Sequence, residues 1–196
     1  MSAHPALDAP SAWVARFAPL VPPGEVLDLA CGSGRHARLL AAAGHPVLAV
    51  DRDPAALAAC AGPGISTLAL DLEEAEFQWP FGKGRFAGIV VANYLHRPLF
   101  PALFDSLAPG GILIYETFAQ GNGRFGKPSN PAFLLQPGEL LDRARAHCAD
   151  AGDPLRIIAF EDGYAALPRP AMVQRICLAK DAGKDAGQGG EAVFAL

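Results

Sequence analysis

The chain has 196 residues, of which 51% are hydrophobic and 18% charged, and its formal net charge is −4. This composition excludes an intrinsically disordered chain, and the acidic balance argues against a nucleic-acid partner. The 4 cysteines are scattered without a C-x-x-C pair, so neither a disulfide framework nor a metal site is expected. No leader and no bilayer-spanning apolar run is evident, which favours a soluble cytoplasmic protein without a membrane partner.

Short apolar strands alternate with amphipathic helices along the chain. Strands are expected over 26–30, 46–50, 65–70, 86–92, 111–116, 155–160 and 172–179, and helices over 10–19, 35–43, 53–60, 98–108 and 139–150. This alternation is typical of a doubly wound α/β sheet, mostly parallel, with helices on both faces. We predict a single domain over residues 1–180, whose last two strands form a hairpin. The Gly-, Ala-, Lys- and Asp-rich stretch 181–196 is predicted to be a disordered tail.

A glycine-rich turn follows the first predicted strand. The chain reads Cys31-Gly32-Ser33-Gly34 between that strand and the helix expected from residue 35. Gly32 and Gly34 allow a ligand to approach the backbone closely, and the helix start offers unpaired N–H groups. A Gly-x-Gly turn alone also occurs as an ordinary strand–helix connection, so its surroundings must decide.

Two carboxylates follow the next two predicted strands. Asp51 ends the second strand, where it can accept hydrogen bonds from both hydroxyls of a ribose, and Asp71 ends the third, within reach of an adenine amine. The third glycine of a dinucleotide-binding turn is missing, since Ala37 stands there. Asp28, just before the turn, disfavours a phosphate and suits a cationic ligand. A nicotinamide-dependent oxidoreductase is accordingly the least favoured function class.

Four motifs in order resemble the class I S-adenosylmethionine-dependent methyltransferases. The segment 28–34 (DLACGSG) resembles their motif I, Asp71-Leu72 their adenine-contacting pair, 86–96 their motif IV, and 107–113 (LAPGGIL) the turn before their fifth strand. The resemblance covers roughly residues 22–120 and implies a seven-stranded Rossmann-like sheet ending in an antiparallel hairpin. Within the class, small size and layout look closest to the tellurite-resistance-type enzymes.

The resemblance also implies the cofactor S-adenosylmethionine, with S-adenosylhomocysteine as product, and a set of binding residues. It assigns Gly32 and Gly34 to the methionine portion, Asp51 to the ribose, Arg52, Asp71 and Leu72 to the adenine, and the Asn93 backbone to the amino group, with Asp28 and Ala30 completing motif I. Ala30 replaces the first glycine of the family pattern. Arg35 at the helix start contacts either the cofactor carboxylate or the substrate, or is a solvated residue of the first turn.

Three residues after the fourth and fifth predicted strands are candidates for catalysis. His96 is a candidate general base, or a histidine bonded to backbone at a helix entry. Tyr94 is expected to line the cofactor or substrate pocket. Glu116 is a candidate for orienting a substrate proton, or a carboxylate that stabilises the next loop. The N-P-P-[YFW] signature of amino-group DNA methyltransferases is absent, because Tyr94 and Leu95 stand where its prolines would be.

A long Gly- and Pro-rich segment, 119–136, is predicted to be a lid-like insertion. It would bring Arg124, Phe125 and Lys127 to a substrate with an anionic group. A mobile insertion without function is the alternative.

The sequence thus predicts methyl transfer to a small-molecule acceptor by in-line displacement, which depends chiefly on alignment. One alternative is an RNA- or protein-directed methyltransferase, supported if Arg143, Arg145, Arg156 and Arg169 form a basic patch. Another is a non-catalytic S-adenosylmethionine-binding module whose acceptor side is plugged by 119–136. The assembly expected is a monomer or homodimer.

Overall fold

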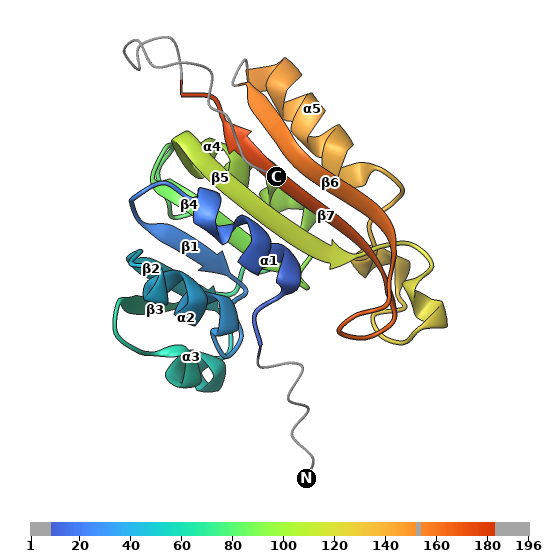
Figure 1. The fold of residues 1–196 in the computed structure, drawn as a ribbon, viewed down its shortest axis with the longest axis horizontal. Coiled ribbons are helices and arrows are strands. Elements are labelled where there is room, and N and C mark those ends of the chain that lie inside the picture. The colour runs from blue at the N-terminus through green and yellow to red at the C-terminus, as the bar shows by residue number, and fades with distance from the viewer. Residues whose placement is uncertain (1–8, 152–153, 183–196) are drawn as a thin grey trace.

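The computed structural model describes residues 9–151 and 154–182, which form one mixed sheet in the order β3-β2-β1-β4-β5-β7-β6 (Figure 1). The parallel strands are β1 (Val26–Leu29), β2 (Val47–Asp51), β3 (Ile65–Ala69), β4 (Phe86–Ala92) and β5 (Leu107–Phe118). β7 (Ala171–Lys180) pairs antiparallel with both β5 and β6 (Leu155–Ala165). The predicted sheet with its C-terminal hairpin is confirmed. The tail predicted over 181–196 lies outside the described residues from 183 on.

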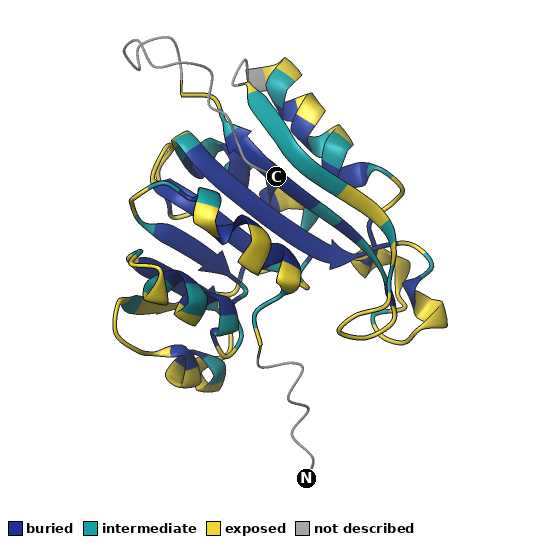
Figure 2. Ribbon diagram, viewed as in Figure 1, coloured by how far each residue is buried: buried dark blue, intermediate teal, exposed yellow. Residues whose placement is uncertain are grey.

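Helices pack on both faces of this sheet, as predicted. α1 (Ala12–Phe17), α2 (Arg35–Ala42) and α3 (Pro54–Cys60) share one hydrophobic core with the sheet, and α4 (Phe100–Ser106) and α5 (Glu139–Ala151) share the other. Successive strand residues point to opposite faces: Ile112 and Ile114 of β5 belong to the first core, Leu113 and Tyr115 to the second. Figure 2 shows the central strands buried between the two helical layers.

Several boundaries differ from the prediction, including those of the helix expected over 10–19, whose α-helical part is Ala12–Phe17. The helix expected over 98–108 is a 3₁₀ helix, Arg97–Leu99, followed by the shorter α4, and β5 begins at Leu107 instead of 111. Ala108 precedes Pro109, which disfavours helical backbone there. The hairpin strands extend to Ala165 and from Ala171, beyond the predicted ends, because exposed polar residues of β6 interrupt the apolar pattern.

The edge strand β3 is also more exposed than predicted. Its four residues after Ile65 are exposed, although a sheet buried on both faces was expected. The described chain from 70 to 85 forms no helix that would cover them.

Other short segments of the described chain form 3₁₀ helices: Ala18–Leu20, Asn122–Arg124 and Pro131–Phe133. Within the described part of the chain, no helix has the length and apolarity needed to cross a bilayer.

The strand order reverses between β1 and β4. The chain moves from β1 outward through β2 to β3, and then returns to place β4 on the other side of β1. In open α/β sheets, ligands bind outside the carboxyl ends of the strands at such a reversal. The turn after β1 and the residues after β4 meet at this point, so the fold directs attention to this edge.

Candidate functional site

The turn between β1 and α2 forms the floor of the candidate site. Ala30, Gly32 and Gly34 hold positive φ angles of 53°, 54° and 80°. A Cβ on Gly32 would meet no atom within 4 Å, whereas one on Gly34 would collide with the side chain of Cys60. Gly34 therefore permits close packing against α3, while Gly32 leaves open space above the backbone. The turn thus offers its backbone to a ligand.

Asp28 and His36 are buried beneath this turn. Asp28 is 1% exposed, and burial raises the pKa of its carboxyl group to about 7, although a hydrogen bond from the Ala37 backbone opposes the rise. Its Oδ2 has no hydrogen-bond partner among the described residues. Nε2 of His36 accepts a hydrogen bond from the Ser11 amide at 3.1 Å, and burial lowers the imidazole pKa to about 3. Neutral His36 therefore fixes the segment before α1 against α2.

Asp51, at the end of β2, supports the turn from the side. Its Oδ2 accepts a hydrogen bond from the Gly32 amide at 2.8 Å, and its Oδ1 accepts one from the Asp53 amide at 3.0 Å. The half-buried side chain lines a cavity of about 210 Å³, here called the smaller cavity. The other lining residues are Ala30, Arg52, Leu70, Asp71, Leu72, Glu73 and Tyr94. Carboxylates beside leucine and tyrosine side chains suit a ligand with hydroxyl or amino groups on a flat apolar body.

Most residues predicted to bind the cofactor meet around the smaller cavity. Five of them line it directly: Ala30, Asp51, Arg52, Asp71 and Leu72. Gly32 adjoins it through its bond to Asp51, whereas Asp28 is buried under the turn and Gly34 packs against Cys60. Asn93, with a φ of 60°, lines a second cavity instead. The individual roles of these residues remain predictions.

The second, larger cavity has a volume of about 500 Å³ and lies on the α1 side of the sheet edge. Its lining consists of residues 9–12, Arg35, Asn93, Glu116, Thr117, Phe118, Ala165, Leu167, Pro168, Arg169, Ala171, Val173 and Arg175. Asn93 lines this cavity and the next residue, Tyr94, lines the smaller one. The two cavities therefore flank the chain directly after β4.

A ladder of charged side chains crosses β5, β7 and β6, and two of its members, Glu116 and Arg175, line the larger cavity. Glu116 of β5, Arg175 of β7 and Glu161 of β6 are cross-strand neighbours. Nε of Arg175 lies 3.1 Å from Glu116, and its Nη1 lies 3.1 Å from Glu161. Glu116 is only 7% exposed, so Arg175 compensates a largely buried negative charge.

The three candidates for catalysis do not lie together. Glu116 lines the larger cavity in its ion pair with Arg175, and Tyr94 lines the smaller cavity. Burial and the nearby Glu73 raise the pKa of the Tyr94 hydroxyl, while the Tyr115 hydroxyl donates to the Tyr94 carbonyl at 2.7 Å. His96 lines neither cavity.

The predicted lid residues lie outside the larger cavity. Arg124 lines a separate cavity of about 280 Å³, and Lys127 lines another together with Phe118 and Arg169. The ring of Phe125 packs against that of Tyr164 of β6, tilted by 43° with the ring centroids 5.3 Å apart. Segment 119–136 is itself anchored, because the buried Asn122 side chain donates to the Pro128 carbonyl and accepts from the Met172 amide. Its role as a lid remains a prediction.

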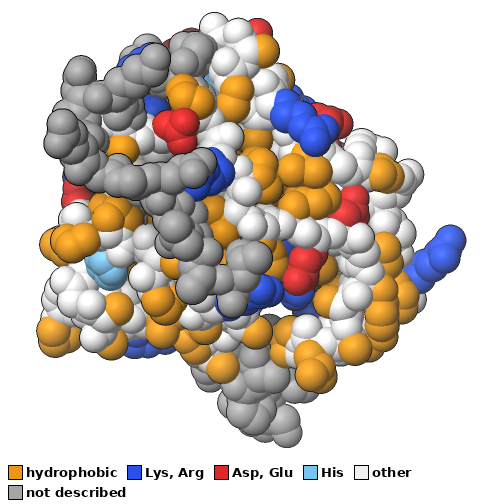
Figure 3. All heavy atoms as spheres, turned by 45° about the horizontal axis from the view of Figure 1, so that its top comes forward, with side chains coloured by type: hydrophobic (Ala, Val, Ile, Leu, Met, Phe, Trp, Pro, Cys, Tyr) orange, Lys and Arg blue, Asp and Glu red, His pale blue; other side chains and the backbone are white. Residues whose placement is uncertain are grey.

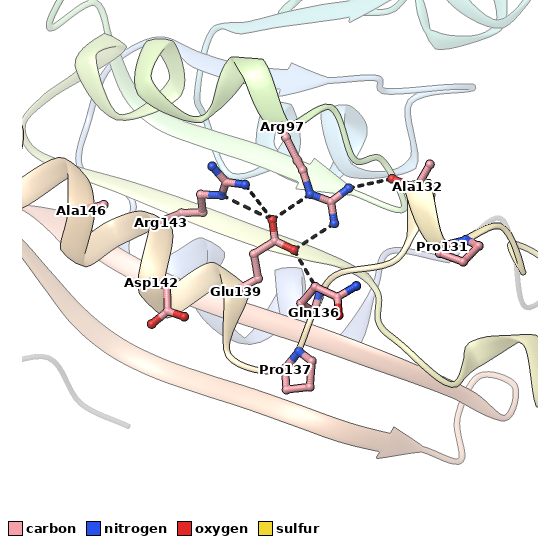
Figure 4. A pocket seen from close by; sticks show the side chains of 9 residues that line it. All are labelled: Arg97, Pro131, Ala132, Gln136, Pro137, Glu139, Asp142, Arg143 and Ala146. Carbon is pink, nitrogen blue, oxygen red and sulfur yellow. Dashed lines mark hydrogen bonds and ion pairs between the residues drawn. The ribbon is translucent and has the colours of Figure 1, made fainter.

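Arg97 and Glu139 fix the end of segment 119–136 to the rest of the molecule (Figure 4). Arg97 donates to both carboxylate oxygens of Glu139 and to the backbone carbonyls of Ala132 and Leu134. Burial by itself raises the pKa of Glu139, but hydrogen bonds from Arg97, the Gln136 amide and Arg143 outweigh it and lower the value to about 2. Arg97 lies four residues after Asn93, so this network joins the chain after β4 to segment 119–136.

The sequence interpretation missed the contribution of the hairpin to the site. Leu167, Pro168 and Arg169, in the turn between β6 and β7, line the larger cavity, as does Arg175. Arg175 stands in an apolar strand pattern two residues before Cys177, which packs in the core on the same sheet face. The sequence did contain one indication of this: Arg175 is a charged residue at an inward-facing position of the strand predicted over 172–179.

The arginines considered as a basic patch are dispersed. Arg143 pairs with Glu139 at 3.0 Å and Arg145 lies 4.0 Å from Asp142, both on α5, whereas Arg169 lines the larger cavity. On the face shown in Figure 3, basic and acidic side chains are interspersed among hydrophobic ones. These observations favour a ligand held in a cavity over a polyanion bound along a surface.

Comparison with known proteins agrees with this geometry. The profile of a family described as "Methyltransferase domain" matches residues 26–111, from β1 to the turn within β5. Trans-aconitate 2-methyltransferase of Methylobacterium radiotolerans is 34% identical over 157 residues, which cover 74% of this chain and 54% of the relative. The chain therefore spans about half the length of this curated relative.

Solved structures share the fold at low sequence identity. A methyltransferase from Methanosarcina mazei superimposes with a TM-score of 0.65 at 14% identity, covering 89% of this chain and all of the other. Geranyl diphosphate C-methyltransferase from Streptomyces coelicolor, solved with geranyl diphosphate and S-adenosylhomocysteine, gives a TM-score of 0.62 at 15% identity, covering 88% of this chain and 80% of the other. At such identities the likeness shows the fold and does not test the predicted tellurite-resistance-type subgroup. Residues 26–111 thus match a methyltransferase-domain family, and the chain has the fold of S-adenosylmethionine-dependent methyltransferases of known structure.

Proposed function

We propose that this protein binds S-adenosylmethionine and transfers its methyl group to a small-molecule acceptor. The observation that carries the proposal is the pair of cavities flanking the chain after β4, one lined by the carboxylates of Asp51 and Asp71 and the other large enough for a metabolite. The relative named for trans-aconitate supports a small-molecule acceptor.

The residues around the turn fit this cofactor. The open backbone at Gly32 admits its amino-acid portion, and Asp51 offers acceptors for two ribose hydroxyls. Leu70, Leu72 and Tyr94 supply apolar contact for an adenine ring, with Asp71 available to its amino group. When bound, the cofactor supplies an already activated methyl group. The chain's task is then to align an acceptor and exclude water, which accounts for a site with few acid–base groups.

In the proposed arrangement, the acceptor occupies the larger cavity. Asn93 lines this cavity and the next residue, Tyr94, lines the smaller one, so the donor and acceptor would meet at this part of the chain. Glu116 is held by Arg175, so its proposed role is to keep this part of the cavity lining rigid and polar, or to orient an acceptor proton. His96, which lines neither cavity, is the weaker candidate for a general base.

Calorimetric titration with S-adenosylmethionine and S-adenosylhomocysteine tests the cofactor assignment. Asp51→Ala should weaken binding about tenfold or more, because it removes the acceptor of the ribose hydroxyls, and Asp51→Asn should lie between it and the native protein. Asp142→Ala, on the exposed side of α5, is the matched control and should bind like the native protein. Absence of heat with both ligands would refute the proposal.

A further inference from the structure

We propose that the acceptor is a small organic anion with an apolar body, and that Arg169 determines this specificity by binding its anionic group. This inference rests on the proposed function, because it assigns a substrate class to the larger cavity. It starts from the side chains that line that cavity and from how their charges are compensated.

The lining of the larger cavity contains more basic than acidic side chains. Among the described residues it contains Arg35, Arg169 and Arg175, and a single carboxylate, that of Glu116. Glu116 and Arg175 compensate each other at 3.1 Å. Arg169 is exposed, and a ligand that covers it would have to pair with its charge, so an anionic ligand is favoured over a neutral one.

The same ion pair disfavours a cationic acceptor. An amine would need a carboxylate to bind its charge, and the lining carboxylate of Glu116 is already bound to Nε of Arg175 and nearly buried. An incoming ammonium group would compete with Arg175 for a carboxylate whose charge is already compensated, so it would gain little net attraction there. The ladder therefore offers a cationic acceptor no uncompensated carboxylate, and selection falls to Arg169.

Arg169 is an exposed residue of the cavity lining, where it can bind the anion. It stands in the hairpin turn between Pro168 and Pro170, and its guanidinium carbon lies 5.8 Å from the centre of the Phe118 ring. Both Phe118 and Arg169 line the larger cavity. A guanidinium held over an aromatic ring keeps its N–H edge available for a planar carboxylate or a phosphate.

The remaining walls define the body of the acceptor. Ala12, Phe118, Ala165, Leu167, Pro168 and Val173 present apolar surface to the cavity. Leu167 is 79% exposed, which is unusual for a large aliphatic side chain and is explained if a ligand covers it. The cavity therefore suits a molecule that is apolar along its length and anionic near the hairpin turn.

The test uses a metabolite extract separated by anion exchange at neutral pH into an anionic and a non-anionic fraction. Each fraction is incubated with the protein and methyl-labelled S-adenosylmethionine, and the transferred label is counted. We expect the label in products of the anionic fraction. Arg169→Gln should raise the KM for that fraction about tenfold, as for loss of a charge-assisted hydrogen bond, with kcat largely retained.

Arg145→Gln is the matched control, since Arg145 is an exposed arginine on α5 away from the cavity, and its KM should equal that of the native protein. Affinity for S-adenosylhomocysteine, measured in parallel, should be unchanged in both variants. The inference is overturned if label enters the non-anionic fraction alone, if Arg169→Gln leaves KM unchanged, or if the cofactor binds and neither fraction accepts methyl. Failure of S-adenosylhomocysteine to bind the native protein would instead overturn the proposed function.

Discussion

Two buried titratable residues lie on either side of the α2 start, and their pKa values move in opposite directions. Burial raises the pKa of Asp28 to about 7 and lowers that of His36 to about 3. Folded Asp28 therefore holds a proton that the unfolded chain releases above its ordinary pKa, so its contribution to stability falls as pH rises between about 4 and 7. Folded His36 lacks a proton that the unfolded chain binds, so its contribution falls as pH drops from about 6.5 toward 3.

Single variants should separate these opposing contributions. Asp28→Asn leaves the His36 effect uncompensated, so stability relative to the native protein should increase with pH between about 4.5 and 7. His36→Gln should show the reverse trend over the same range. Urea unfolding at both pH values measures the free energies, and the native protein is the reference for each difference. Equal pH dependence in all three proteins would contradict the burial-driven shifts of both groups.

The two glycines of the turn should respond differently to alanine. Both have positive φ, which costs an alanine about 1 kcal/mol or more. Gly34→Ala adds a collision with Cys60, whereas Gly32→Ala meets open space. Gly34→Ala should therefore unfold at lower urea concentration than Gly32→Ala, while Gly32→Ala should chiefly weaken S-adenosylhomocysteine binding. The reverse order of stabilities would show that the packing against α3 is not what requires Gly34.

At the level of elements, the sequence predicted the sheet, the hairpin and the turn because each depends on local patterning. Continuous apolar runs without polar alternation indicated that β1 and β4 are strands buried on both faces. Gly32, followed by Asp51 at the end of the next strand, indicated a ligand-binding turn after β1. Strand ends in the hairpin were not predictable, because Glu161 and Asp162 lie on an exposed edge strand where polarity carries no information about pairing. The larger cavity escaped prediction because residues 9–12, Phe118 and Arg169 meet only in the folded chain.

A partly buried ion pair, Arg97 with Glu139, holds the end of segment 119–136. Removing the charge of Glu139 leaves Arg97 and Arg143 without their shared carboxylate, so Glu139→Gln should lower the free energy of unfolding by about 1–3 kcal/mol. The hydrogen bonds from Arg97, Gln136 and Arg143 lower the pKa of Glu139 from 4.5 to about 2. In the native protein this stabilisation should therefore be lost as pH falls from about 4.5 toward 2, because Glu139 then becomes protonated. The variant should also be cleaved faster by protease within 119–136.

The same helix provides a matched control for this ion pair. Arg145→Gln removes a pair whose side chains are 73% and 72% exposed, and should change stability by less than about 0.5 kcal/mol. If the two variants lose equal stability, the partial burial of the Arg97–Glu139 pair contributes nothing specific to the segment.

For the whole molecule, the carboxyl edge of the sheet is where segments distant in sequence converge. The segment before α1 is held by His36, the turn by Asp51, and the larger cavity is closed by the hairpin. Ligand binding stabilises the folded state by an amount set by its concentration over Kd, about 2.7 kcal/mol at a hundredfold excess. We therefore expect ligand binding to slow local unfolding of the segments at this edge together, and to leave the opposite edge of the sheet unchanged.

Hydrogen exchange with and without S-adenosylhomocysteine measures which segments take part. We expect the strongest added protection over 30–34 and 93–95, which adjoin the smaller cavity, and unchanged exchange in the amino-terminal half of α5. Residues 122–133 should also be unchanged, because Arg124 and Lys127 face other cavities and Asn122 already anchors the segment. If 122–133 gained as much protection as 93–95, the segment would instead be a lid that closes on the cofactor. Protection there would require a contact that forms only when the ligand is bound.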